Sequence, residues 1–283
     1  MSNLKPTKSK FENSCKPRQT SIHRLENRSI VFARMLIFAA VAILFSINSS
    51  KADETKKHLF ILSGQSNMTG GLKTGFTQRV EAEFGKENVT IAYHCKSGRG
   101  IRFWDKDYRF PNDYEFPGKG APSERTKKQH GQVYGPMMKK VKDACNGKSH
   151  DTITFIWMQG ESDGSRGLGD VYEESFLRLL NRIKNDLNRK DISFVIGRIN
   201  NARLNGPSSN LWKRVRDVQV NLAKDAVDGD WIDTDDLSRP DAGVHFPANN
   251  YPKLGSRFAE KAIVLIQKRA ARAEKETQGV NSK

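Results

Sequence analysis

The segment HLFILSGQSNM, residues His58–Met68, carries the features that decide the fold of this chain. Its first half, His58–Leu62, is a mostly apolar run of the length typical of a strand buried on both faces. Its second half, Gly64–Met68, is polar and contains turn-forming residues. A serine just past a buried strand stands at the edge of a sheet, where its hydroxyl is accessible. The segment therefore predicts a central strand followed by a turn that presents Ser66.

Similar apolar runs alternate with helix-like stretches through the rest of the chain. Strands are expected at His58–Leu62, Val89–Tyr93, Thr152–Trp157, Ser193–Ile199 and Asp230–Ile232. Helices are expected at Tyr134–Cys145, Val171–Leu187, Leu211–Ala226 and Pro252–Arg272. Strands that alternate with helices form a parallel sheet covered on both faces. We therefore predict the α/β class: a three-layer α/β/α sandwich with a flavodoxin-like parallel five-stranded sheet, in which sites form at the carboxyl ends of the strands.

Residues 1–52 have the pattern of a signal peptide with an extended n-region. This n-region is polar and basic, and the apolar run Met35–Ile47 is typical of a signal-peptide core and short for a membrane span. Small residues precede a cleavage site expected after Ala52. Cleavage would give a secreted or periplasmic protein with no stable membrane association. An uncleaved signal anchor is the alternative, and translation starts at either Met1 or Met35.

The net charge of +16 is partly a property of this leader. Residues 1–52 contain nine Lys or Arg and two Asp or Glu, so +7 belongs to them and +9 to the remainder. No basic patch is interleaved with aromatic residues and no nucleic-acid motif is present, so nucleic acid is not an expected partner. The remaining charge favours either a polyanion, such as a sulfated or uronic-acid polysaccharide, or an ordinary solvated surface.

The remainder is expected to form one domain, residues 53–272, followed by a disordered tail at 273–283. Within the domain, the Pro-, Gly- and aromatic-rich stretch Asp105–Gln129 is too long for an ordinary connection. It is either a substrate-facing loop or a surface insertion without a role. Cys95 and Cys145 either pair, as export allows, or remain free thiols. Neither has neighbours that suggest a metal site.

Ser66 and His245 are the candidate nucleophile and base. A serine hydroxyl is inert until a base removes its proton. His245 is the natural base, because it lies in a loop just before the last expected helix, in the context Gly-Val-His-Phe. Triads are defined by geometry rather than chain order, so an early serine and a late histidine can form one. Alone, each residue has an ordinary explanation as a turn serine or a surface histidine, and the companion motifs favour catalysis.

The acid that would orient this histidine is expected nearby in sequence. Asp241 precedes His245 by four residues and can hold the imidazole tautomer and stabilise the protonated ring. Asp235 and Asp236 are further options, with loop solvation or helix capping as their alternative roles. Asp241 is the first choice because it is nearest.

Acyl transfer also needs donors directed at the developing oxyanion. The candidates are the backbone N–H of Ser66, the backbone N–H of Gly98 and the side-chain amide of Gln159. Glycine permits a close backbone approach. Gln159 begins the cluster QGESD, which follows a buried strand and is richer in polar groups than a simple turn requires.

These motifs resemble the SGNH hydrolase superfamily, and within it the sialate O-acetylesterase-like and acetylxylan-esterase-like proteins of carbohydrate esterase family six. Gly64–Asn67 matches the Gly-Gln-Ser-Asn block of that branch, and Ser97–Trp104 matches its glycine block. Trp157–Asp163 matches its Trp-x-Gln-Gly-Glu-Ser-Asp block. His245 and Leu254–Ala259 match its Asp-x-x-His and Leu-Gly-x-Arg-x-Ala blocks. The resemblance covers essentially the whole chain after the leader.

The resemblance implies an SGNH hydrolase fold and an exported carbohydrate O-acetylesterase. Such an enzyme removes acetyl groups from a polysaccharide or sialic acid through a Ser-His-Asp acyl-enzyme mechanism. Glu161 and Asn67 are expected to support the site from behind the reacting groups, and no metal or organic cofactor is implied. A lipase or thioesterase of the same superfamily is poorly supported because the sequence has no long apolar lid. No feature of the sequence indicates an oligomeric state.

Two departures from the family pattern bear on this function. Ser97 and Arg99 replace the usual Gly and Thr of the glycine block, and Arg99 either binds an anionic substrate or points outward. Ala242 stands where the triad Asp is expected. Either Asp241 serves through a one-residue bulge, or the site is a slower Ser-His dyad, or activity is lost. The last case gives a second hypothesis, an inactive glycan-binding protein on the same fold.

Overall fold

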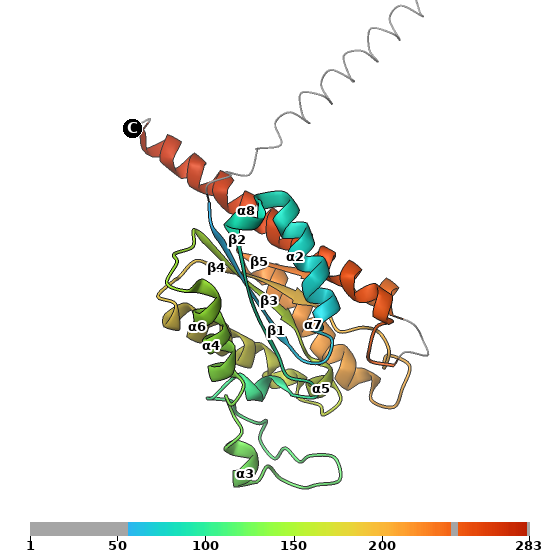
Figure 1. Cartoon of the computed structure of the whole chain (residues 1–283). Helices are drawn as coiled ribbons and strands as arrows, with labels where there is room; N and C mark the ends of the chain where they lie inside the picture. Colours follow the sequence, from blue (N-terminus) through green and yellow to red (C-terminus); the bar gives the residue numbers. More distant parts are fainter. Residues whose placement is uncertain (1–55, 239–242, 282–283) are drawn as a thin grey trace, which may run out of the picture. The chain divides into compact units, whose positions relative to one another are not determined.

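The computed structural model describes residues 56–238 and 243–281, and its centre is one parallel sheet. The strands are β1 (His58–Gly64), β2 (Val89–Cys95), β3 (Thr152–Met158), β4 (Ile192–Gly197) and β5 (Gly229–Ile232). Their order is β2-β1-β3-β4-β5, and every neighbouring pair is parallel. This is the flavodoxin-like strand order, so the predicted fold class is confirmed (Figure 1). The expected leader and the residues Asp241 and Ala242 lie outside the described residues.

Helices cover both faces of the sheet. They are α2 (Gly70–Phe84), α3 (Glu124–Lys127), α4 (Tyr134–Cys145), α5 (Glu161–Gly164), α6 (Tyr172–Asp186), α7 (Ser209–Asp225) and α8 (Tyr251–Asn281). Short 3-10 turns lie at Lys86–Asn88, Ile101–Phe103, Gly169–Val171, Asp235–Leu237 and Ala248–Asn250. Buried residues of α2 and α8 share one core cluster with the sheet, and those of α4, α6 and α7 share the other. The chain is therefore a three-layer sandwich with a separate core on each side of the sheet.

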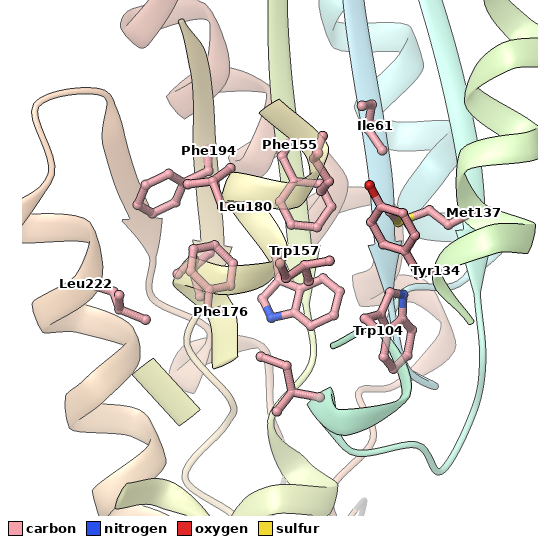
Figure 2. Close-up of a cluster of buried hydrophobic side chains, with 14 of the residues drawn as sticks. Ile61, Trp104, Tyr134, Met137, Phe155, Trp157, Phe176, Leu180, Phe194 and Leu222 are labelled. Atoms are coloured by element: carbon pink, nitrogen blue, oxygen red, sulfur yellow. The ribbon is translucent and has the colours of Figure 1, made fainter. Parts of the chain in front are cut away.

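Strand β1 shows how the sequence fills both cores. Successive side chains of a strand point to opposite faces. Accordingly, Phe60 and Leu62 pack in the cluster with α2 and α8, whereas Leu59 and Ile61 pack in the other. All four are essentially inaccessible to solvent, which explains why the run is continuously apolar. Figure 2 shows part of the second cluster, where aromatic side chains of β3, β4 and α6 lie together.

The expected strands and helices are present, with ends shifted by up to two residues at all but one terminus. Helix α6 illustrates why periodicity found them, since its buried apolar residues recur at helical spacing. They are Tyr172, Phe176, Leu179, Leu180 and Ile183.

The sequence analysis missed α2, because this helix is rich in glycine and weakly amphipathic. It begins at an N-cap, Thr69, whose hydroxyl accepts the N–H of Leu72 at 3.2 Å. The glycines have a packing reason. A Cβ on Gly75 would lie 2.0 Å from the carbonyl oxygen of Pro252, and one on Gly255 would lie 2.1 Å from that of Leu72. Helices α2 and α8 therefore meet backbone to backbone.

The expected disordered tail from residue 273 is wrong as far as Asn281, because α8 continues to that residue. The sequence from Ala270 to Glu276 is Ala-Ala-Arg-Ala-Glu-Lys-Glu, which consists of strong helix formers without Gly or Pro. The segment is mostly exposed. Local propensity therefore extends the helix beyond the part that the core requires.

The stretch Asp105–Gln129 is a folded segment that lies between the 3-10 turn Ile101–Phe103 and helix α4. Phe116 and Gly120 form an isolated antiparallel bridge, and α3 lies near the end of the segment. The chain returns where the N–H of Gly131 donates to the carbonyl of Arg102 at 2.9 Å. We call this segment the insertion.

Cys95 and Cys145 are both free thiols, which settles the alternative that the sequence left open. Among the described residues, no helix combines the length and apolar character needed to cross a bilayer.

Candidate active site

The carboxyl ends of β1 and β3 meet so closely that only glycine fits at the end of β1. Gly64 has φ +154°, and a Cβ there would lie 2.0 Å from the carbonyl oxygen of Met158. The next residue, Gln65, donates its N–H to that same carbonyl at 3.0 Å. The backbone then turns away from the sheet. This turn leaves Ser66 partly exposed, while Gln65 and Asn67 on either side are buried.

Ser66 and His245, 179 residues apart in sequence, are brought together at this edge of the sheet. The Oγ of Ser66 lies 3.0 Å from Nε2 of His245, within hydrogen-bond distance. His245 is exposed and lies in the loop just before α8. A neutral imidazole at this distance can accept the hydroxyl proton, so the pair has the geometry of a nucleophile and its base.

Asn67 links the turn after β1 that carries Ser66 (the nucleophile turn) to the loop before α8 that carries His245 (the histidine loop). Its Nδ2 donates to the carbonyl of Val244 at 2.8 Å, and its Oδ1 accepts the hydroxyl of Tyr251 at 2.9 Å. Asn67 is 1% exposed, so neither bond competes with bulk water. Since Val244 immediately precedes His245, these bonds position the base. The sequence indicated only a general supporting role for this residue.

Two buried carboxyl groups lie behind the site. Oε1 of Glu161 accepts the second Nδ2 hydrogen bond of Asn67 at 2.5 Å, and Oδ2 of Asp163 accepts the N–H of Ile101 at 3.0 Å. Burial raises the pKa of Glu161 to about 7 and the pKa of Asp163 to about 6. Neither carboxyl forms an ion pair among the described residues. Both are therefore held by amide and backbone donors rather than by cations.

Two of the three expected oxyanion donors line the cavity in front of Ser66. The N–H groups of Ser66 and Gly98 have no protein acceptor among the described residues. Gly98 has φ +67° and is exposed, in a turn after β2. Both N–H groups are therefore free to donate to a bound oxygen.

Gln159 lies elsewhere than the sequence suggested. It is completely buried and does not line the cavity. Its Nε2 donates to Oε1 of Gln65 at 3.1 Å, to the carbonyl of Arg99 at 3.2 Å and to Asp163 at 2.5 Å. These acceptors surround the buried amide and occupy its hydrogens. Gln159 therefore connects three loops of the site instead of facing the substrate.

The two alternative acids are bound to arginines. Asp235 accepts hydrogen bonds from Arg216 at 2.7 and 2.8 Å and from Arg198 at 2.8 Å. Asp236 pairs with Arg257, with both contacts at 2.5 Å. Among the described residues, no carboxylate bonds to Nδ1 of His245. Asp241 lies outside the described residues.

The Ser66–His245 pair opens into a cavity of about 1070 Å³. Its charged wall is mostly cationic, and among the described lining residues Glu161 is the single carboxylate. The cations are Arg102, Lys119, Arg166 and Arg203. None of the four has a carboxylate partner among the described residues, whereas most other arginines do. Arg99, the cation that the sequence suggested, instead stacks on Phe103 at 4.7 Å and lies outside the cavity wall.

Within residues 56–238 and 243–281, no group of His, Cys, Asp and Glu side chains has an arrangement that could hold a metal ion.

The parallel sandwich and the polar cluster at the carboxyl ends of β1 and β3 agree with the arrangement that the sequence motifs predicted. Residues 71–264, more than half of the chain, match the family model described as "carbohydrate esterase, sialic acid-specific acetylesterase". The chain therefore belongs to this family of enzymes that act on acetyl esters, and the resemblance found in the motifs is confirmed. The matched range contains Gln159, Glu161 and His245 and begins just after Ser66.

Solved structures share the fold. A protein of Arabidopsis thaliana is 16% identical over 74% of this chain and 98% of its own, with a TM-score of 0.54. A carbohydrate acetylesterase from Xanthomonas citri is 18% identical over 68% of this chain and 39% of its own, with a TM-score of 0.51. At this identity, the similarity establishes the fold alone. No curated protein matches the chain.

Proposed function

We propose that this protein is an exported glycan O-acetylesterase that works through a covalent acetyl-enzyme on Ser66. The observation that carries the proposal is the 3.0 Å contact between Ser66 Oγ and His245 Nε2 at the mouth of a large cavity. Membership of an acetylesterase family supplies the ester class. The rival hypothesis, an inactive glycan-binding protein, is not favoured, because a paired nucleophile and base are retained.

The reaction follows from the position of each group. His245 Nε2 takes the proton of Ser66 as Oγ attacks the acetyl carbonyl carbon. The N–H groups of Ser66 and Gly98 donate to the carbonyl oxygen as it becomes negative. The carbon–oxygen bond to the sugar then breaks, and the protonated histidine gives its proton to the leaving alkoxide. Water, deprotonated by the same histidine, then attacks the acetyl carbon; the bond from this carbon to Oγ breaks, acetate leaves, and the histidine returns the proton to Ser66.

Asp241 is the proposed acid of the triad. Asp235 and Asp236 are poor candidates, because both already bind arginines. An Asp241→Asn variant should lower kcat by about 10⁴-fold if this carboxylate holds the correct tautomer of His245. Retained activity would instead point to a Ser-His dyad whose histidine is held mainly through Asn67.

The charges of the cavity favour an acidic substrate. Four cations without carboxylate partners face the space in front of Ser66, and clustered charge of one sign attracts an oppositely charged ligand. Small polar side chains such as Ser97, Ser162 and Ser165 share the wall. A lipid acyl chain fits such a wall poorly. The substrate we propose is an acetylated sugar that carries a carboxylate, as a sialic or uronic acid does.

Export is proposed from the leader alone. The expected cleavage after Ala52 predicts a secreted or periplasmic chain that begins at Asp53. Mass determination of the protein recovered from the native cell envelope or medium tests this site, and an intact Met35–Ile47 segment would contradict it.

The decisive experiment for the function compares three forms of the purified chain on 4-nitrophenyl acetate, acetylated uronic-acid glycan and O-acetylated sialic acid. They are the wild type, Ser66→Ala and Ser97→Ala, which alters another serine of the same cavity. We expect Ser66→Ala to lower kcat by at least about 10⁴-fold and Ser97→Ala to stay within a few-fold of the wild type. Equal acetate release by the wild type and Ser66→Ala would disprove the proposed nucleophile.

A further inference from the structure

We propose that the insertion carries a second sugar-binding subsite, which holds an unacetylated residue of the same glycan outside the catalytic cavity. The proposal rests on the proposed function, and it adds that the natural substrate is an oligomer or polymer. The subsite is a separate cavity of about 450 Å³. Its walls come entirely from the insertion and the residue that follows it, His130.

The floor of this second cavity is aromatic. Phe110 and Tyr114 stack with ring centroids 5.2 Å apart and planes inclined by 13°, and Phe116 meets both rings edge-on. Tyr108 packs edge-on against Phe110 at 5.0 Å. Phe110 and Tyr114 are half-buried and line the cavity. Flat aromatic surface of this kind suits the C–H faces of a sugar ring.

Two polar atoms beside this floor have no partner among the described residues. They are the hydroxyl of Tyr108 and Nε2 of His130, and both residues line the cavity. A buried polar group without a hydrogen bond costs about 1–3 kcal/mol. Burial also lowers the pKa of His130. A sugar hydroxyl both donates and accepts hydrogen bonds, so it can pair with a tyrosine hydroxyl and with a ring nitrogen.

The two cavities are joined through one segment of chain. Ala121 lines both of them, and Phe116, Pro117 and Lys119 of the insertion line the catalytic one. The two cavities are therefore adjacent, as two subsites for residues of one glycan require. The charged rim of Arg109, Asp113 and Lys127 offers further partners for hydroxyl and carboxylate groups.

The insertion is anchored to the active-site side of the molecule. Arg102, on the wall of the catalytic cavity, donates to the carbonyl of Thr126 and to Oε1 of Gln129, each at 3.0 Å. The hydroxyl of Tyr114 donates to the carbonyl of Arg166 at 3.0 Å. These bonds hold the aromatic floor at a fixed place relative to Ser66, as a subsite requires.

The test separates glycan length from ester chemistry. Binding is measured by titration calorimetry on Ser66→Ala, and kcat/KM is measured on the active chain. The probes are acetylated oligogalacturonides and acetylated xylo-oligosaccharides, each compared with its acetylated monosaccharide. The variants are Tyr108→Phe, which removes only the unpartnered hydroxyl, and Phe110→Leu, which removes a ring of the floor. Tyr134→Phe is the matched control, because Tyr134 is equally buried but its hydroxyl bonds to Asp186 and lines neither cavity.

We expect an oligomer to be preferred over its monomer by about tenfold or more, and Tyr108→Phe and Phe110→Leu to reduce this preference by about fivefold each. Activity on 4-nitrophenyl acetate should be unchanged in both variants and in Tyr134→Phe. The subsite would be overturned if affinity and kcat/KM were the same for oligomer and monomer, or if the preference for the oligomer were unchanged in both variants. If the wild type hydrolysed no ester but Ser66→Ala still bound the oligomer more tightly than the monomer, the proposed function would be overturned and the subsite would stand.

Discussion

The nucleophile turn and the histidine loop hold their catalytic side chains in very different ways. Ser66 follows a central strand paired on both sides, and its turn is fixed by backbone contact between Gly64 and Met158. His245 is exposed, and its loop is fastened by hydrogen bonds from Asn67 to Val244 and from Asn200 to Gly243. The sheet therefore sets one partner, whereas a few side-chain amides set the other. Catalysis should be far more sensitive to small changes around the histidine than around the serine.

The largest expected effect comes from removing the histidine itself. His245→Ala should lower kcat by about 10⁴-fold or more, because Ser66 then has no base. The fold should not change, since the side chain is exposed. Steady-state kinetics and thermal unfolding of the variant measure the two effects, and a loss of activity explained by unfolding would contradict the assignment.

The second prediction concerns variants that weaken the hydrogen bonds of Asn67 to the histidine loop but leave His245 in place. Asn67→Ala should lower kcat by about 10²-fold, because a displacement near 1 Å is enough for such a loss. Tyr251→Phe removes only the hydroxyl bond to Asn67 and should cost about fivefold or less. If the two variants lose equal activity, or if KM rises while kcat is kept, Asn67 does not act by positioning the histidine.

The third prediction concerns the buried acid beneath Asn67. Burial raises the pKa of Glu161 from 4.5 to about 7, so between these values the folded chain keeps a proton that the unfolded chain has released. Stability from this group is thus greatest below about pH 4.5 and falls as the pH rises through about 7. Asp163, with its pKa raised to about 6, acts in the same direction.

Glu161→Gln should remove the larger part of this decline. Urea unfolding at several pH values from 5 to 8 measures the free energy of unfolding of both proteins. Between these pH values the variant's free energy of unfolding should rise relative to that of the wild type by an amount on the order of 3 kcal/mol. Parallel stability curves for the two proteins would mean that Glu161 does not titrate in this range.

The smallest expected effect comes from removing single cations from the wall of the cavity that contains Ser66 and His245. Lys119→Gln and Arg203→Gln should each raise KM for an acidic acetylated sugar by about three- to tenfold at low salt and leave 4-nitrophenyl acetate hydrolysis unchanged. Lys148→Gln, near the amino end of β3, is the control. An equal rise in KM for a neutral acetylated sugar would show that the cations do not select for charge.

Periodicity in the sequence was sufficient to predict the sheet and four of its long helices. It missed α2, because the glycines that let α2 approach α8 also weaken its helical pattern. For the site, the sequence motifs predicted that Ser66, Gly98 and His245 would lie together at the carboxyl edge of the sheet. It did not reveal that Gln159 is buried among internal acceptors, or that Asp235 and Asp236 already bind arginines. Such pairings depend on contacts between distant segments, which a linear pattern does not record.

The glycine contact between α2 and α8 has a consequence for the active site, because the two helices carry its two halves. Gly75 lies nine residues after Ser66, and Gly255 lies ten residues after His245. The contact joins main chain to main chain, so no side-chain rotamer can lengthen or shorten it. It therefore fixes how closely α2 and α8 approach, in addition to the hydrogen bonds that hold the histidine loop. A single methyl group added at Gly75 or Gly255 should push the two helices apart and shift Ser66 relative to His245 without entering the cavity.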